Sequence, residues 1–419
     1  MVLKNLAGIA TTLCVAMLIM TSIPSRAQQP KVRTLTEQEL VDMMLGSSIQ
    51  ASRGSDTPAT VKRVKDALAA GKTFTMISLE DVPDEWTTIT PGGAGGGGAW
   101  QYVIQRAKQQ NLPMVQNGNL LAAQALSKYL GKQFSAVIRT EGDGATINGL
   151  MLASDLNVPI VDGCLSGRAR PEIEQQIPTV MGIPSFPTAY VTRWGDTIIL
   201  KNAVDDYRVE DIARAIAVGS GGGASGVMNP MSGAEAKRSV IAGALTQAIL
   251  LGRTAREAVA EQKDPIDAVL KVVHGYRLFH GVVARDDTKG DRGFTWSDVT
   301  LEGIGADEGH TYRIWVKNEN NVAWYDGVPD AMSPDFIQDL DPATADAHLG
   351  PTLGAFRVGA EIVMVGWAND PRWRTPKGIE VFGPRHFGFD FDYAPIEQLQ
   401  KRRNNPLVGS EEATAMVPR

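Results

Sequence analysis

Residues 134–164 read FSAVIRTEGDGATINGLMLASDLNVPIVDGC, and this stretch decides the fold. The runs 134–138 and 158–161 are almost continuously apolar, as is typical of strands that are buried on both faces of a sheet. Residues 145–156 lie between them and carry the spacing of a helix. A buried strand, a helix and a second buried strand in this order predict a parallel sheet with helices packed on both faces.

The segments on either side extend this pattern. Thr36 and Glu39 have the form of a capping box, which predicts a helix that continues to Ile49. Beyond residue 277 the chain is rich in β-type residues between Gly, Asp and Asn turns. The other elements that we expect are helices over 59–71, 99–110, 208–218 and 232–262, and short strands over 73–78, 86–89 and 196–200.

These elements predict an α/β N-terminal domain with a mainly parallel sheet, followed by an α+β C-terminal domain rich in strands. We expect the first domain over residues 34–190. The second covers 191–398, with a helical first part and a β-rich part from 277. The segment 399–419 is polar and lacks an apolar pattern, so we expect a disordered tail there.

The first 27 residues have the form of a secretory signal peptide. Lys4 is followed by an apolar run over 6–20, and Ser25-Arg26-Ala27 ends in a small-x-small cleavage signal. The run is shorter than the roughly 20 residues that span a bilayer, so no retained membrane span is expected. We therefore expect a protein that is exported, either periplasmic or extracellular, after the leader is removed.

Net charge restricts the classes of partner. The chain carries a net charge of −6, and removal of a leader with two basic residues would make it −8. Nucleic acid is therefore not an expected partner, because binding to phosphates requires a basic surface. A small-molecule substrate is favoured, and a homo-oligomer is left open.

Acidic residues follow both buried strands of the opening stretch. Glu141 and Asp143 come after the first strand, and Asp162 and Cys164 after the second. Ligands of open α/β sheets bind outside the carboxyl ends of the strands, so these side chains are candidate catalytic groups. Arg168 and Glu172, a few residues further on, are candidates for a cationic clamp and a further acid or base. As an alternative, Asp and Glu after strands serve as turn formers and helix caps.

Residues 91–100, PGGAGGGGAW, predict a glycine-rich loop between a short strand and a helix. Gly93, Gly95 and Gly98 match the pattern G-x-G-x-x-G. Backbone N–H groups of Gly95, Gly96 and Gly97 could bind a substrate carboxylate or an oxyanion. A flexible surface loop is the alternative. The second glycine-rich segment, SGGGASG at 220–226, is interpreted as a linker.

Cys164 is the one cysteine that remains after the leader, so no intramolecular disulfide can form. A nearby cation such as Arg168 could activate it as a nucleophile. It could equally be a passive thiol, because none of the five histidines lies within 100 residues of it. No histidine pair has zinc-ligand spacing. The sequence thus indicates no cofactor, and a divalent metal held by carboxylates is left open.

Several longer stretches resemble a known family. They are TEGDGATINGL, VPIVDG and GRARPE in the first half, and SGVMNPMSGAEAKRSVIAGALTQAILLGR, VKNENNVAW, PDFIQDLD and WRTPKGIEVFGPRHFGFDFDY in the second. In this order they resemble bacterial hydantoinase/oxoprolinase-associated proteins named for S-methyl-thiohydantoin desulfurase.

The resemblance covers about residues 36–396 and implies two domains and the cleavage or desulfuration of five-membered cyclic imides. The positions that carry over by motif are Glu141, Asn148, Asp162, Gly167, Arg168 and Glu172. Of these, Asn148 and Gly167 are expected to contact the substrate.

We therefore expect a hydrolase-like enzyme for a cyclic amide or thiohydantoin. Asp162 or Glu141 would act as the base that activates water, and Arg168 would stabilise the developing negative charge. The alternative is an exported small-molecule-binding or accessory protein that keeps the fold without catalysis.

Overall fold

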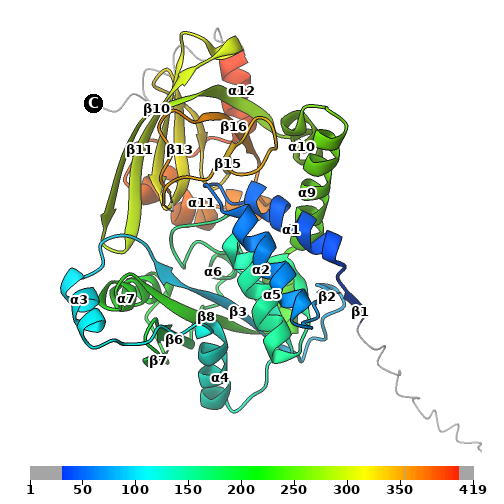
Figure 1. Ribbon diagram of the computed structural model, residues 1–419, viewed down its shortest axis with the longest axis vertical. Helices are drawn as coiled ribbons and strands as arrows, with labels where there is room; N and C mark the ends of the chain where they lie inside the picture. The colour runs from blue at the N-terminus through cyan, green and yellow to red at the C-terminus, as the bar shows by residue number, and fades with distance from the viewer. Residues whose placement is uncertain (1–30, 353, 405–419) are drawn as a thin grey trace, which may run out of the picture.

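The computed structural model describes residues 31–352 and 354–404, which form two β-sheets with associated helices. In Figure 1 the strand-rich second sheet lies above the first, and α1 and α9 lie side by side along the junction. The expected leader at 1–27 and the segment 405–419 of the expected tail fall outside the described residues. No helix in the described ranges is sufficiently long and apolar to cross a membrane.

The first sheet has nine strands with a parallel core. Strands β2, β5, β4 and β3 run parallel to one another, and β1, β8, β6, β7 and β9 pair in antiparallel fashion around them. All residues of β4 and β5 are buried, as their apolar sequences predict. The strands are β1 (Val32–Thr34), β2 (Thr75–Ser78), β3 (Thr87–Gly95), β4 (Ala136–Arg139), β5 (Ile160–Cys164), β6 (Thr188–Thr192), β7 (Thr197–Leu200), β8 (Gly223–Ser232) and β9 (Ile241–Ala242).

Helices cover this sheet and join it to the second. Thr36 and Glu39 form the expected capping box of α1. A Cβ atom on Gly46 of α1 would lie 1.8 Å from the Ala248 carbonyl oxygen of α9, so only glycine permits this close approach of the two helices. The helices are α1 (Glu37–Ile49), α2 (Thr57–Ala69), α3 (Gln101–Gln109), α4 (Gly118–Leu130), α5 (Gly144–Leu156), α6 (Ile177–Val180), α7 (Asp206–Gly219), α8 (Gly233–Ser239), α9 (Ala244–Ala260) and α10 (Pro265–Val273).

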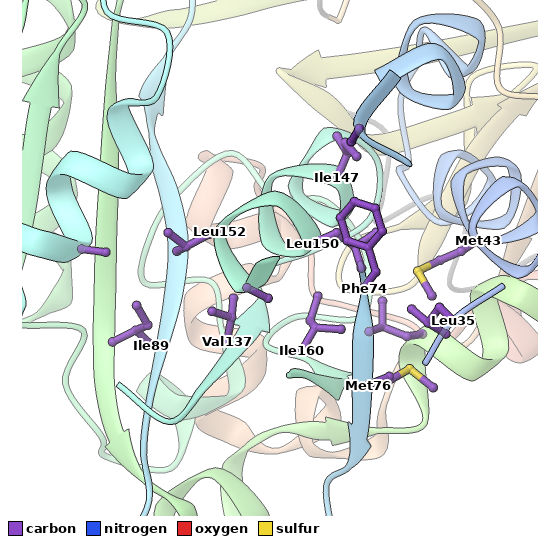
Figure 2. Close-up of a cluster of buried hydrophobic side chains, with 14 of the residues drawn as sticks. Leu35, Met43, Phe74, Met76, Ile89, Val137, Ile147, Leu150, Leu152 and Ile160 are labelled. Carbon is purple, nitrogen blue, oxygen red and sulfur yellow. The ribbon is translucent and has the colours of Figure 1, made fainter. Parts of the chain in front are cut away.

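The largest apolar core lies between the first sheet and the helices on one of its faces. Figure 2 shows Val137 and Ile160 of the two central strands beneath Leu150 and Ile147 of α5. Each of these four side chains is fully buried. The strand-helix-strand stretch of residues 134–164 therefore supplies the centre of this core.

Two expectations for the first half are wrong in detail. The expected helix from Ser232 to about Gln262 is broken into α8 and α9, because residues 241–242 pair with β5 and Gly243 adopts a left-handed conformation. The glycine-rich segments 91–95 and 223–226 are not loops, because they pair with each other in β3 and β8. Residue 190, the expected end of the first domain, lies within β6.

The second sheet is antiparallel throughout, in the order β14-β13-β12-β11-β10-β16-β15. Its strands are β10 (Tyr276–Asp291), β11 (Phe294–Gly303), β12 (Thr311–Lys317), β13 (Glu319–Tyr325), β14 (Val328–Met332), β15 (Phe336–Leu340) and β16 (Glu361–Trp367). The helical segments are η1 (Gly305–Asp307), η2 (Pro371–Arg374), α11 (Pro376–Phe382), η3 (Pro384–Phe387) and α12 (Ile396–Asn404). The expected class, an α/β domain followed by a strand-rich domain with helices, is confirmed. Residues 399–404 of the expected tail belong to α12.

Candidate functional site

A polar cavity of about 230 Å³ lies at the carboxyl ends of β3 and β4. Its walls come from β3 and β8 themselves, from the segment after β4 and the start of α5, from the loop after β5, and from Arg53 and Arg214. A second cavity of about 430 Å³ shares Glu172 and Arg214 with it and contains Trp100, Phe294 and Trp296. A small polar molecule suits the first cavity, since pockets for drug-sized ligands measure about 300–1,000 Å³.

Glu141 is the acidic group of the first cavity. It follows β4, is partly buried, and accepts a hydrogen bond from the Arg170 backbone N–H at 3.3 Å. Burial raises the pKa of the Glu141 carboxyl above its ordinary value, while the positive charges of Arg170 and Arg53 oppose the rise. A carboxyl with a raised pKa in a cavity is suited to both accept and donate a proton at moderate pH.

Guanidinium groups from three segments line this cavity, those of Arg53, Arg170 and Arg214. Arg53 donates to Asp143 at 3.1 Å and to Glu319 at 2.9 Å, which joins the two domains. Arg214, on α7, donates to the backbone carbonyls of Gly95 and Pro171. Arg214 also pairs with Glu210 at 2.7 Å, so carboxylates already share the charges of Arg53 and Arg214. The cavity still presents N–H donors to a ligand that develops negative charge.

Glu172 stands where the two cavities meet. Its carboxylate forms an ion pair with Lys317 and lies 2.6 Å from His386 Nε2. Burial opposes ionisation of Glu172, but the hydrogen bond with His386 and the charge of Lys317 outweigh it and lower the pKa to about 2. Lys317 and His386 both come from the second domain, so Glu172 is held ionised by groups far away in the sequence.

Comparisons with known proteins agree with this two-domain architecture. Family models described as "S-Me-THD-like, N-terminal domain" and "S-Me-THD-like, C-terminal domain" match residues 38–202 and 204–396. The chain belongs to the S-Me-THD-like family. A crystal structure of a protein from Chromobacterium violaceum has the same fold, with a TM-score of 0.68 and 19% identity over 87% of this chain and 100% of that chain. A search of curated proteins found no match.

In this S-Me-THD-like chain, the structure brings Glu141, Asn148 and Glu172 together in the first cavity. Asn148 lies on α5, and its side-chain oxygen accepts from Arg63 at 3.3 Å. Asp143, at the start of α5, does not line the cavity and instead accepts from Arg53 and Ser55. Glu141, Asn148 and Glu172 are thus the sequence-predicted residues that a ligand in this cavity could contact.

Asp162 caps a helix. Helix α9 begins after Gly243, which has no side chain to cap it. Asp162 Oδ1 accepts instead from the backbone N–H groups of Leu245 at 2.8 Å and Thr246 at 3.0 Å, and Oδ2 accepts from the Thr246 hydroxyl. Both carboxylate oxygens are therefore engaged at the positive end of the helix, and we assign Asp162 a structural role.

Replacing Asp162 with alanine is expected to lower the free energy of unfolding by about 1–2 kcal/mol, because two helix N–H groups lose their acceptor. Urea unfolding monitored by circular dichroism measures this change. The Asp162→Asn variant is the matched control, since asparagine keeps an oxygen that can cap the helix and should lose less. Equal stability of the alanine variant and the native protein would contradict the capping role.

Cys164 and Gly167 are packed away from the cavity. The Cys164 thiol is fully buried, lies 3.2 Å from the Thr140 carbonyl oxygen that it donates to, and accepts from the Gly167 N–H at 3.3 Å. A Cβ atom on Gly167 would lie 2.3 Å from Asn369 Oδ1. These contacts indicate that both residues serve packing. The Cys164 thiol bonds across a turn to Gly167, and the missing side chain of Gly167 leaves room for Asn369 of the second domain.

Arg168 joins the two domains from a fully buried position. It donates to the Asp335 carbonyl at 2.8 Å and to the Asn320 carbonyl at 2.6 Å, both in the second domain. Its guanidinium also lies over the Phe382 ring, 5.4 Å from the centroid. Arg168 lines neither cavity, so its contacts identify it as a domain clamp and not as a group that meets substrate.

The segment 95–97, which was expected to bind a carboxylate or an oxyanion, also forms a contact between the two domains. A Cβ atom on Gly96 would lie 2.2 Å from the Gly293 carbonyl oxygen, in the turn between β10 and β11, and one on Gly97 would lie 2.1 Å from Gly290 Cα, near the end of β10. The Gly95 carbonyl accepts from Arg214 at 2.6 Å. Glycine is needed here because two backbones touch. Of the glycines in the stretch 91–98, Gly92 and Gly93 line the cavity.

Arg53, Arg214, Lys317 and His386 were not predicted as site residues. Each comes from a segment without a local motif for catalysis. Lys317 and His386 do lie in VKNENNVAW and FGPRHFGF, two of the stretches that carry the family resemblance. A charged residue within a stretch that carries the family resemblance was the signal that could have indicated Lys317 and His386.

Asp339, on β15 of this S-Me-THD-like chain, is a buried carboxyl whose pKa is raised. Asp339 is fully buried, accepts from Asn320 at 2.8 Å, and its Oδ2 has no hydrogen-bond partner among the described residues. Burial raises the pKa of Asp339 to about 7, and the hydrogen bond from Asn320 opposes the rise. Folding therefore favours the protonated form of this side chain.

Between the ordinary pKa and 7, the folded state holds a proton that the unfolded state has lost, so stability falls as pH rises. The Asp339→Asn variant should lose this dependence. We expect the decline in unfolding free energy from pH 5 to pH 8 to shrink by about 2–3 kcal/mol. Denaturant titrations at several pH values measure it. The exposed Asp287→Asn serves as control, and an unchanged decline in Asp339→Asn would refute the assignment.

Proposed function

We propose that the protein is a hydrolase-like enzyme that opens or desulfurates a five-membered cyclic amide or thiohydantoin. The observation that carries this proposal is Glu141, a carboxyl with a raised pKa in a cavity of about 230 Å³ with Arg53 and Arg170 beside it. The resemblance to proteins named for S-methyl-thiohydantoin desulfurase supports the choice of ring.

In the proposed reaction, water adds to the ring carbon that bears oxygen or sulfur, and the Glu141 carboxylate takes the proton of this water. The guanidinium groups of Arg53 and Arg170 stabilise the negative charge that develops on the oxygen, sulfur or nitrogen atom double-bonded to that carbon. The C–N or C–S bond then breaks, and Glu141 returns the proton to the leaving nitrogen or sulfur. The products are a ring-opened carboxylate with a new N–H group, or a hydantoin and a thiol.

Mass spectrometry tests this proposal. The purified protein is incubated with hydantoins, S-methyl-thiohydantoins and oxoproline, and the products are identified by their masses. Formation of a ring-opened acid or a thiol supports the proposal. A panel without product argues against it and favours the alternative, a binding or accessory protein.

A specific observation favours that alternative as the second candidate. Asp162, Cys164 and Arg168 are engaged in capping, packing and clamping, which leaves the cavity fewer reactive groups than the sequence indicated. A binding protein would take up a small anion in the cavity without turnover. Calorimetric titration with the ring compounds of the panel would detect such binding.

We also propose that the protein is exported. The support is the leader-like sequence over residues 1–27, which lies outside the described residues. N-terminal sequencing of protein recovered from the native host tests this. A first residue at or near Gln28 is the expected result, and a retained Met1 would contradict it.

A further inference from the structure

Two carboxylates and an imidazole converge beside the cavities. Glu172 and Glu174 belong to the segment after β5, and His386 belongs to η3 of the second domain. His386 Nε2 lies 2.6 Å from Glu172 Oε2 and 3.7 Å from Glu174 Oε1. One donor atom from each of the three residues lies within 4.8 Å of the other two.

Glu174 is the most weakly paired member of this cluster, because its contact with His386, at 3.7 Å, is too long for a hydrogen bond. It is 2% exposed, and its Oε2 atom has no hydrogen-bond partner among the described residues. The neighbouring acidic groups have basic partners: Glu172 forms an ion pair with Lys317, and Glu210 forms one with Arg214. Glu174 shares the His386 imidazole with Glu172, which lies closer to it. A buried carboxylate with so little compensation is costly, because desolvation penalises a poorly paired charge.

We propose that Glu172, Glu174 and His386 form a binding site for one divalent transition-metal ion. The ion supplies a positive charge at bonding distance from Glu174, which the shared His386 imidazole does not. A span of 3.7 Å between His386 Nε2 and Glu174 Oε1 is one that an ion bonded to each at about 2.1 Å can bridge. Glu172 reaches the ion through Oε2 while Lys317 holds its other oxygen, as supporting residues commonly do for metal ligands.

The donor set selects the kind of ion. An imidazole nitrogen with two carboxylate oxygens suits Zn²⁺ or Mn²⁺ better than Mg²⁺ or Ca²⁺, which prefer oxygen ligands alone. Three protein ligands leave further coordination positions, as in metal sites that also bind water or substrate. Glu172 lines both cavities, so the ion would lie at their common border. The site would also link the two domains.

Metal binding is measured on the full purified protein after removal of metals with a chelator. Elemental analysis after dialysis against Zn²⁺ or Mn²⁺ gives the stoichiometry, and calorimetric titration gives the affinity. We expect one ion per chain and a higher melting temperature with the ion, since a ligand of the folded state stabilises it. Mg²⁺ and Ca²⁺ should bind more weakly.

Two variants locate the site. Glu174→Gln and His386→Ala should each lower the affinity by more than about 100-fold, since even loss of a supporting residue costs about 10- to 100-fold. Glu174→Gln keeps the shape of the side chain and removes its charge, so we expect it to fold and to melt at a higher temperature than the metal-free native protein. His280→Ala is the matched control, because His280 also pairs with a glutamate, Glu361 at 2.9 Å, without a third ligand.

No bound Zn²⁺ or Mn²⁺, or equal affinity in the native protein and Glu174→Gln, would overturn the proposal. A loss of affinity in His280→Ala equal to that in His386→Ala would do the same. These measurements use no substrate. A failed metal experiment therefore leaves the ring-opening proposal standing, and a silent substrate panel leaves the metal site standing.

Discussion

Replacing Glu141 with glutamine is expected to lower the turnover of a cyclic amide or thiohydantoin by about 10²- to 10⁴-fold, the range that general acid–base catalysis contributes. Glutamine has nearly the same shape and can still accept the hydrogen bond from the Arg170 backbone N–H. It cannot take a proton from water. The change therefore removes the base and keeps the cavity, and steady-state kinetics on a compound identified by the substrate panel measures it.

The pH dependence of kcat/KM provides a second measurement of the same group. The base must be ionised, so the rate should rise with pH through the pKa of Glu141, which burial holds above the ordinary value of 4.5. In the glutamine variant this rise should disappear. Glu80→Gln is the matched control, because Glu80 also follows a parallel strand, β2, but is exposed and outside both cavities. Undiminished turnover in Glu141→Gln would remove Glu141 from the mechanism.

Replacing Arg168 with methionine is expected to lower the free energy of unfolding by about 3–5 kcal/mol. Each hydrogen bond from a charged donor is worth about 1.5–3 kcal/mol, and Arg168 makes two to carbonyls across the domain junction. Methionine keeps an apolar stem but has no guanidinium, so the loss arises from the two buried carbonyl groups that are left without this donor and from the space that the guanidinium filled. Chemical denaturation measures the change.

Arg208→Met is the matched control for this experiment. Arg208 lies on α7, its side chain is 56% exposed, and its partner Asp211 is equally accessible to water. A surface ion pair of this kind contributes about 0–1 kcal/mol. If Arg168→Met cost no more than Arg208→Met, Arg168 would not act as the domain clamp.

Local pattern was sufficient for some elements and misleading for others. The buried runs of β4 and β5 and the capping boxes of α1 and α8 were recognisable because strand burial and helix capping depend on neighbouring residues. Strand β8 was missed because its glycine-rich start resembles a linker. It is a strand because it pairs with β3, and no local propensity shows a partner that lies 130 residues away.

The candidate site shows the same division. Glu141 and Glu172 were expected, since each follows a strand whose carboxyl end is a common place for ligands. The strand-end rule alone could not separate Asp162 from Glu141, because both were expected to follow a parallel strand. In the structure Asp162 lies within β5. The difference is the helix α9: its start lies against Asp162, whereas Glu141 opens onto the cavity.

The sequence by itself determined the two-domain class, the parallel core of the first sheet and the family. These properties depend on apolar periodicity, on residue counts and on stretches that can be compared directly. Only the tertiary structure decided which charged residues face the cavity and which hold the domains together. Ion pairs such as Lys317 with Glu172, and the approach of His386 to Glu174, join residues more than 140 positions apart. Such pairs form because an unpaired buried charge is costly, so charged residues from distant segments pair where the fold brings them together. A local sequence pattern does not contain this information.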